Sequence, residues 1–406
     1  MRCGVWSEET EVLVEEGSQA VLPCHINLQS PAVAQVRWGK NNAGTVWRKD
    51  RSGLEYYGIA WTQRGIHHRV RCPHTGFSMG NYSLYMTNVT EKDGGLYSCR
   101  AEGNGRLVHK WVTLRVIKVS TAPSAPVEGT EMVLSCNMTP WHKTATTHWR
   151  LNGELIGPQE NQINDIEGAS THKVAVPQRV LRRRASQSLA GNWTCVVRTE
   201  HSRGEATQHL SVRGIVHPTG DHTRVYAAVG SAVTLPCVFS HGAIPSNLVW
   251  EKTSGGLNPT SFQLPPSSSS SSSQSPWDGS ASLGAIVPYH QGTYQCSGMM
   301  EGRRLTRRLQ LVISHVESNR GDPEILTCQL SDDSEVTQYE WVHITQDTNG
   351  TPIVTSKQQG KVLRIHGVTE TLGEWACRFY GKKGMLGNAT YPTEKIIPQR
   401  VFPLET

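Results

Sequence analysis

Cysteine is the residue whose type and spacing say most about the chemistry of this chain. The sequence has 406 residues and ten cysteines, eight of which recur in a fixed order with aromatic residues. A cysteine that ends a short apolar run is followed 13 or 14 residues later by a tryptophan, and a second cysteine comes two residues after a Tyr or Trp. The order occurs four times: Cys24, Trp38, Tyr97 and Cys99; Cys136, Trp149, Trp193 and Cys195; Cys237, Trp250, Tyr294 and Cys296; Cys328, Trp341, Trp375 and Cys377. This repetition indicates one structural unit in four tandem copies.

The elements that carry these cysteines are predicted to be strands. Residues 82–86 (Tyr-Ser-Leu-Tyr-Met) and 361–365 (Lys-Val-Leu-Arg-Ile) alternate with a period of two, which is typical of half-buried strands. Glycine-bearing turns follow both runs, and Gly and Pro interrupt stretches that would need more than about ten residues to form helices. The composition, with 38 Gly, 21 Pro and a charged fraction of 18%, also favours turns over long charged helices. We therefore predict an all-β protein.

The repeated pattern resembles that of the immunoglobulin superfamily along the whole chain. In that fold one cysteine from each sheet bridges the core of a sandwich, and a tryptophan packs against the bridge. The resemblance implies four disulfides: Cys24–Cys99, Cys136–Cys195, Cys237–Cys296 and Cys328–Cys377. The first pair spans 75 residues, which leaves room for the extra strands of a variable-type domain, whereas the others span 59, 59 and 49 and suit constant-type domains. We expect four tandem sandwiches, at residues 1–118, 119–213, 214–314 and 315–400, with little linker between them.

Two cysteines, Cys3 and Cys72, lie outside the repeated pattern. An oxidising compartment favours a disulfide between them, and this is the pairing that we predict. A free or intermolecular thiol is the first alternative. A zinc site is the second, because His67, His68 and His74 lie close to Cys72 in the sequence, and imidazole and thiolate are ligands that zinc prefers.

Catalysis and nucleic-acid binding find little support in the sequence. No paired glycines form a phosphate-binding loop before a helix. The net charge of +6 is mild for this length and does not indicate nucleic-acid binding. We expect a protein that is not an enzyme and uses no catalytic residues, cofactor or metal.

Glycosylation sequons point to an extracellular location. Six Asn-x-Ser/Thr sequons occur, at Asn81, Asn88, Asn137, Asn192, Asn349 and Asn388. No apolar run approaches the ~18 residues of a membrane span, so a membrane anchor would lie outside this sequence. These features favour the glycosylated ectodomain of a type I cell-surface protein.

A basic and aromatic segment of the first unit is the candidate binding site. Residues 37–71 contain eight Lys and Arg side chains against two acids. Arg, Tyr and Trp dominate the energetics of protein interfaces. We predict ligand contacts from Trp47, Arg48, Lys49, Arg51, Tyr56 and Tyr57. The alternative is that two of the segment's aromatics belong to the core, and that Arg69 or Arg71 pairs with Asp93 in a structural role.

The order of the four units resembles that of a smaller family within the superfamily. A variable-type unit followed by three shorter ones is similar to the family shared by the helper T-cell co-receptor and the lymphocyte activation gene three protein, which are T-cell surface receptors for class II MHC. Cys237 and Cys296 would supply a disulfide in the third unit, which the helper co-receptor lacks. The resemblance implies an inhibitory co-receptor that binds class II MHC through its first domain, with a homodimer as a further expectation. The alternatives are an activating helper co-receptor and a generic adhesion or glycan-binding receptor.

Overall fold

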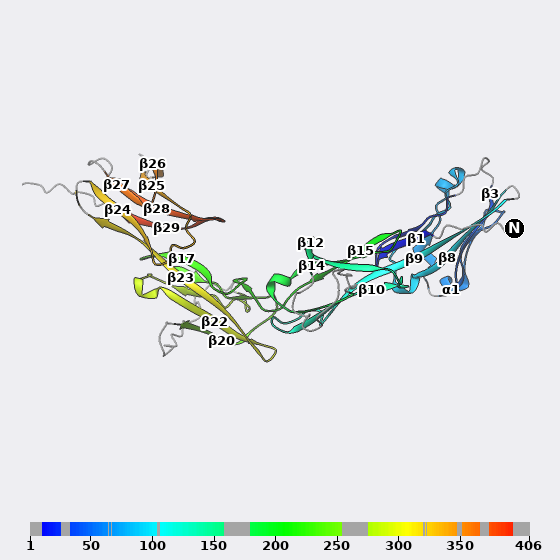
Figure 1. Cartoon of the computed structure of the whole chain (residues 1–406), viewed down its shortest axis with the longest axis horizontal. Coiled ribbons are helices and arrows are strands. Elements are labelled where there is room, and N and C mark those ends of the chain that lie inside the picture. Colours follow the sequence, from blue (N-terminus) through cyan, green and yellow to red (C-terminus); the bar gives the residue numbers. More distant parts are fainter. Residues whose placement is uncertain are drawn as a thin grey trace, which may run out of the picture. The chain divides into compact units, whose positions relative to one another are not determined.

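The computed structural model describes residues 10–25, 33–63, 65, 67–103, 106–157, 179–253, 275–319, 321, 323–346, 351–365 and 373–392. It is an all-β protein built of immunoglobulin-like sandwiches, as predicted (Figure 1). The chain divides into two compact units, Met1–Val212 and Arg213–Thr406. Among the described residues, no helix has the length and apolar character needed to cross a bilayer.

The first sandwich has two sheets around a core that contains Trp38 and the disulfide Cys24–Cys99. One sheet has the order β9-β8-β3-β4-β5, with β1 parallel to β9, and the other has the order β2-β7-β6. β4 and β5 are the extra strands that the long cysteine spacing predicts. The strands are β1 (Thr10–Glu15), β2 (Ala20–Leu22), β3 (Val33–Lys40), β4 (Gly44–Lys49), β5 (Glu55–Tyr57), β6 (Val70–Arg71), β7 (Leu84–Met86), β8 (Gly95–Gly103) and β9 (Arg106–Ala122). The helical turns are α1 (Ile59–Thr62), His67–Arg69, His74–Met79 and Glu91–Asp93.

The second sandwich continues directly from the first because β9 is shared between them. β9 is 17 residues long, and it pairs with β8 in the first sandwich and with β10 in the second. β10 also pairs with β13, and the other sheet has the order β12-β11-β14-β15. The strands are β10 (Glu131–Thr139), β11 (Thr146–Leu151), β12 (Glu154–Ile156), β13 (Val180–Arg184), β14 (Gly191–Arg198) and β15 (Arg203–Leu210), with a helical turn at Gln187–Leu189. The boundary that we propose at residue 118 thus lies inside a continuous strand.

Acidic residues of β1 fasten the first sandwich to the second. The Glu11 carboxylate accepts hydrogen bonds from Arg115 at 2.6 and 2.9 Å and from the Thr199 hydroxyl at 2.9 Å. Burial opposes ionisation of Glu11, but the bonds from Arg115 and Thr199 lower the pKa of its carboxyl. A Glu15 carboxylate oxygen accepts the backbone N–H of Thr207 at 2.7 Å. Glu11 and Glu15 therefore belong to the interface between the first and second sandwiches.

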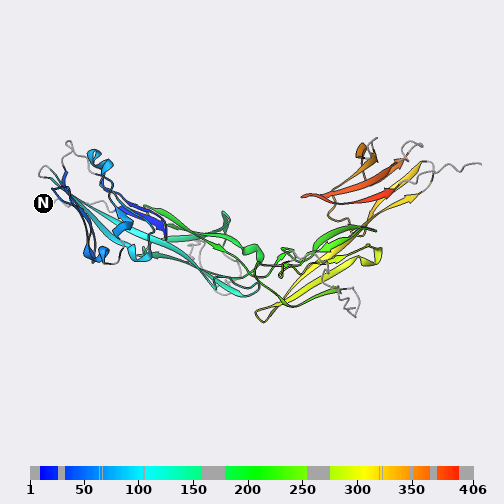
Figure 2. The same ribbon diagram turned by 180° about the vertical axis from the view of Figure 1, so that it is seen from behind.

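The third and fourth sandwiches repeat this plan within the second unit. β23 is also 17 residues long, pairs in parallel with β17, and continues into the fourth sandwich, where it pairs with β24. The third sandwich contains β16 (Ile215–His217), β17 (Thr223–Ala228), β18 (Val233–Leu235), β19 (Val238–Phe239), β20 (Ser246–Thr253), β21 (Ala281–Leu283), a helical turn at Pro288–His290, β22 (Gly292–Met300) and β23 (Arg303–Asn319). The fourth contains β24 (Glu324–Leu330), β25 (Gln338–Gln346), β26 (Pro352–Gln359), β27 (Val362–Ile365), β28 (Glu374–Gly381) and β29 (Gly384–Pro392). The same two pairs of sandwiches can be followed from behind in Figure 2.

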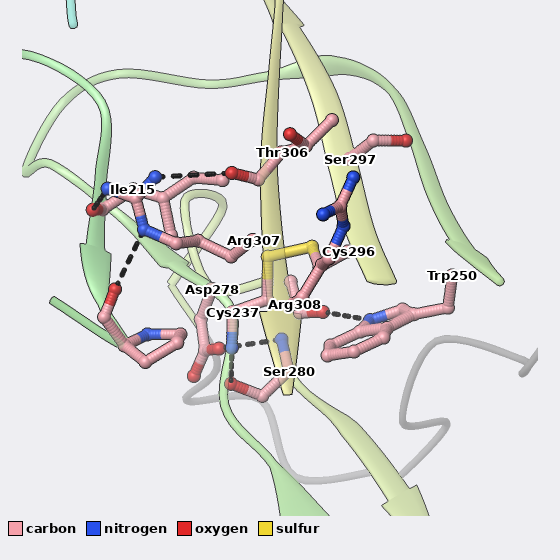
Figure 3. The surroundings of a disulfide bond; sticks show 12 residues. Ile215, Cys237, Trp250, Asp278, Ser280, Cys296, Ser297, Thr306, Arg307 and Arg308 are labelled. Carbon is pink, nitrogen blue, oxygen red and sulfur yellow. Dashed lines mark hydrogen bonds between the residues drawn. A yellow bond between two sulfur atoms is a disulfide. The ribbon is translucent and has the colours of Figure 1, made fainter. Parts of the chain in front are cut away.

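The structure joins the cysteines in the four pairs that the resemblance implies: Cys24–Cys99, Cys136–Cys195, Cys237–Cys296 and Cys328–Cys377. Figure 3 shows the third, where the Trp250 indole beside the sulfurs donates to the Gly279 carbonyl at 2.8 Å. In the same view the buried Arg307 guanidinium donates to the carbonyls of Ile215 and Pro218. Arg307 therefore holds the incoming segment of the third sandwich against its core.

The aromatic residue before each second cysteine of the first three sandwiches also has a structural role. The Tyr97 hydroxyl donates to the Asp93 carbonyl at 2.6 Å, and the Tyr294 hydroxyl donates to the His290 carbonyl at 2.8 Å. In the second sandwich the Trp193 indole donates to the Leu189 carbonyl at 2.8 Å. These bonds tie the preceding turn to the strand that carries the cysteine, which explains the recurrent aromatic residue.

Cys72 is buried in the first sandwich, and its thiol donates to the Tyr82 carbonyl at 3.4 Å. Burial raises the pKa of this thiol to about 12. Cys3, its predicted partner, lies outside the described residues, so their disulfide stays a prediction. Among the residues that the structure describes, no group of three His, Cys, Asp or Glu side chains is placed to hold a metal ion.

Candidate binding face of the first domain

The candidate site is the outer face of strands β9, β8, β3, β4 and β5 in the first sandwich. Side chains alternate across a strand, so residues next to the core positions Trp38 and Cys99 point outward. Arg37 stands opposite Arg48 on one neighbouring strand and opposite Arg100 on the other. Directly opposite residues of antiparallel strands share a face, so these three arginines form one row. We call the full set the arginine row, which runs from Tyr56 through Arg48, Arg37 and Arg100 to His109, on β5, β4, β3, β8 and β9.

The three arginines are exposed and close together. No described residue forms an ion pair with Arg37 or Arg100, and the Arg48 guanidinium lies over the Tyr56 ring, 4.5 Å from its centroid. Like charges directly opposite one another destabilise a strand pair. The centre of this face is thus a concentrated positive charge that the described part of the chain does not neutralise.

Beside the arginines, this face also carries a histidine and an ion-paired glutamate. The His109 ring packs on Trp111 at a centroid distance of 4.6 Å, and burial together with the nearby Arg100 lowers the pKa of His109. His109 is therefore neutral at pH 7. Two residues after Arg100 on β8, the Glu102 carboxylate accepts a hydrogen bond from the Arg51 guanidinium at 3.1 Å, and both side chains are solvent-exposed. Glu102 is thus engaged by a fourth arginine.

The turn between β4 and β5 positions Arg51 and Tyr56. Asp50 accepts hydrogen bonds from the hydroxyl and backbone N–H of Ser52 and from the backbone N–H of Leu54. The bond from the Ser52 hydroxyl is the main reason why the pKa of Asp50 is lowered. An ionised aspartate thus closes the turn and sets the register in which Tyr56 faces Arg48.

The prediction that Trp47 contacts a ligand is wrong. Its side chain is fully buried, and its indole donates to Glu55 at 3.1 Å. The cause is strand alternation, because Trp47 stands opposite Trp38 in the register of β3 and β4, on the core side of the sheet. Trp61 is also buried, so two of the four aromatics Trp47, Tyr56, Tyr57 and Trp61 have buried side chains, as the alternative interpretation held.

The other predicted contact residues divide between the two sides of the sheet. Arg48, Arg51 and Tyr56 are exposed. The Lys49 side chain points to the inner side of the sheet, where its ammonium lies 5.0 Å from the centroid of the Phe77 ring. Tyr57 stands opposite Trp47 and packs against the core. The structure therefore brings three of the six residues to the outer face.

Sequence reasoning missed Arg100 and His109. They lie on β8 and β9, 29 and 38 residues after the end of the basic segment at residue 71, and reach the face only through strand pairing. One signal was present, because Arg100 directly follows the core cysteine Cys99 and alternation turns it outward.

Arg69 is the arginine that pairs with Asp93. Its guanidinium donates to both carboxylate oxygens, at 3.0 and 3.2 Å, and both side chains are largely buried. Burial opposes ionisation of Asp93, but the bonds from Arg69 and from the backbone of Thr90 lower its pKa. Arg69 therefore has the structural role, whereas the Arg71 guanidinium lies 5.9 Å from the centroid of the Tyr85 ring.

The two sequons of the first sandwich lie beside the sheet opposite the arginine row. In the first sandwich Asn81 and Asn88 flank β7, a strand of the opposite sheet. Asn88 is exposed, and Asn81 is half-buried and accepts a hydrogen bond from the Ser83 hydroxyl at 2.6 Å. In the other sandwiches Asn137, Asn192 and Asn388 are exposed, and Asn349 lies outside the described residues. Their glycosylation stays a prediction.

Comparison with known proteins places the first sandwich in a class. Residues 7–117 match the family model of the immunoglobulin V-set domain. The chain is also similar to proteins named lymphocyte activation gene 3 protein. It is 25% identical to that of Mus musculus, covering 83% of this chain and 61% of that protein, and 26% identical to that of Rattus norvegicus, covering 80% and 58%. A CXADR-like membrane protein of Rattus norvegicus is 23% identical, covering 52% of this chain and 57% of that protein.

The chain spans about three fifths of the length of these relatives. The V-set match and the tandem sandwiches together support a protein of immunoglobulin-like domains, similar over most of its length to lymphocyte activation gene 3 proteins.

Proposed function

We propose that this chain is the extracellular part of an inhibitory T-cell co-receptor that binds class II MHC through its first domain. The observation that carries the proposal is the exposed arginine row on a variable-type domain, in a chain that is similar to lymphocyte activation gene 3 proteins over four fifths of its length. Binding on a sheet face requires no catalytic group, cofactor or metal. A type I membrane anchor would follow in the full-length protein.

The geometry supports recognition of a protein through charge and aromatic contacts. Exposed arginines raise the association rate with an acidic partner, and tyrosine adds apolar contact area. Of the residues first predicted from sequence, Arg48, Arg51 and Tyr56 are exposed for such contacts.

The test is binding of the whole chain to immobilised class II MHC by surface plasmon resonance. We expect Arg48→Glu/Arg51→Glu to lower the association rate by about tenfold or more and to weaken the salt dependence. The matched control is Arg182→Glu/Arg184→Glu, which reverses two exposed arginines on β13 of the second sandwich. No binding by the unmutated chain would remove class II MHC from the proposal.

The alternatives need different measurements. A glycan array separates a glycan-binding receptor from a receptor for a protein. A reporter T cell that carries the native downstream sequence separates inhibition from the activating role of a helper co-receptor. The homodimer stays a prediction, which sedimentation velocity of the whole chain checks.

A further inference from the structure

We infer that the arginine row itself is the contact surface, and that it binds a protein surface whose carboxylates fit between the guanidinium groups of Arg48, Arg37 and Arg100. This inference rests on the proposed function in that the first domain binds a protein. It adds the face of the domain, the residues of β3 and β8, and the acidic chemistry of the partner.

The first argument is electrostatic. Arg37 has an arginine directly opposite it on each side, and no described acid forms an ion pair with Arg37 or Arg100. This arrangement costs the folded domain stability, because like charges opposite one another repel. A carboxylate placed between two neighbouring guanidinium groups would remove that repulsion and accept charge-assisted hydrogen bonds. The repulsion among these arginines therefore lowers the stability of the free domain, and binding of an acidic partner would relieve it.

The second argument is the extent of the row. Neighbouring strands lie about 4.8 Å apart, so five positions in register extend over roughly 19 Å. A row of this length is longer than a single sugar residue and matches the dimensions of a protein contact surface. The aromatic residues at the ends, Tyr56 and the tilted pair of His109 and Trp111, add apolar contact beside the charged centre.

The third argument is access. The two sequons of the first sandwich flank β7 in the opposite sheet, so glycans there would extend from the other face. Arg37, Arg48 and Arg100 are exposed, and Tyr56 retains 37% of its accessible surface. The arginine row is therefore open to a partner of protein size.

The experiment compares the whole chain with Arg37→Gln/Arg100→Gln, which keeps a polar hydrogen-bonding side chain at each position but removes two charges of the row. Two readouts are taken: affinity for class II MHC by surface plasmon resonance, and the thermal unfolding temperature without ligand. We expect affinity to fall about tenfold or more, with a smaller salt dependence, while the unfolding temperature stays equal or rises. The control is Arg182→Gln/Arg184→Gln on β13, which should leave both readouts unchanged.

The outcomes separate this inference from the proposed function. Unchanged affinity of the double variant for class II MHC would overturn the inference and leave the proposed function standing. Lost affinity together with a lower unfolding temperature would also overturn it, because that result indicates a structural role for the arginines.

If the unmutated chain does not bind class II MHC, the proposed function fails, and a second probe tests the inference. The probe is poly-L-glutamate, titrated against the whole chain at low ionic strength by calorimetry. Binding that the double variant loses and the control retains supports the row as an acidic-protein site. Absence of such binding overturns the inference, as does binding of a heparin oligosaccharide in its place.

Discussion

At the residue scale, two neighbouring aromatics of the first domain have opposite roles. Trp47 is fully buried and hydrogen-bonded to Glu55, whereas Tyr56 lies on the outer face under Arg48. We expect Trp47→Ala to lower the free energy of unfolding of the first unit by roughly 3 to 5 kcal/mol, as for other buried Trp residues. Tyr56→Ala should change it by about 0.5 kcal/mol or less. Chemical denaturation of the whole chain checks both, and a larger loss for Tyr56 would contradict the assignment of faces.

The Arg69–Asp93 pair makes the first domain sensitive to acid. The folded pKa of Asp93 is lowered, so its contribution to stability is fully present above the unfolded value near 3.8 and is lost as the pH falls through the folded pKa. Asp93→Asn should remove this dependence and, by leaving Arg69 buried without its charge partner, cost roughly 3 to 5 kcal/mol at pH 7. Unfolding free energies of the two proteins at pH 7 and at pH 3 measure the effect. Parallel pH profiles would contradict it.

At the element scale, β15 packs on the first sandwich through a glycine. A Cβ added at Gly204 would lie 2.6 Å from the Leu13 Cβ and 2.8 Å from the Ile117 Cδ1, which is too close for carbon atoms. Gly204→Ala should therefore force β1 and β15 apart and cost about 1 to 3 kcal/mol. Calorimetry should show a lower transition temperature for the unit Met1–Val212 and an unchanged one for Arg213–Thr406. Gly153→Ala is a useful comparison, because no atom lies within 4 Å of the added Cβ. Any loss of stability there would come from the backbone φ of +89°, which is strained for alanine.

The elements also show where sequence reasoning succeeds and where it stops. The spacing of cysteine and tryptophan is local and periodic, so it predicts the sandwiches and the long first domain. Which side of the sheet a residue faces depends on how its strand pairs with the neighbouring strands. The sequence of a short segment does not reveal this pairing. The segment's sequence therefore does not reveal that Trp47, Lys49 and Tyr57 lie on the core side of the sheet. Arg100 was missed because its place beside Arg37 arises from pairing between strands distant in sequence.

At the scale of the whole molecule, the disulfides divide the chain into loops that close within single sandwiches. Each loop spans 49 to 75 residues, and in the chain-entropy model each cross-link contributes about 4 kcal/mol. Peptide mapping without reduction should recover the four predicted pairs and no pair between sandwiches. The same map tests Cys3–Cys72, and both thiols free together with bound zinc would favour the metal alternative.

The unbroken strand β9 has a mechanical consequence. Under the proposed function, the chain is a receptor on one cell that holds a ligand on another and is pulled by it. The load on the first domain would enter the second along the continuous strand β9, with no linker between them. Within the first domain, the ladders that β9 forms with β8 and β1 run along the direction of that strand, so their hydrogen bonds resist the pull in shear and share it. Tension at the ligand is therefore delivered to the next domain instead of being absorbed by a yielding joint.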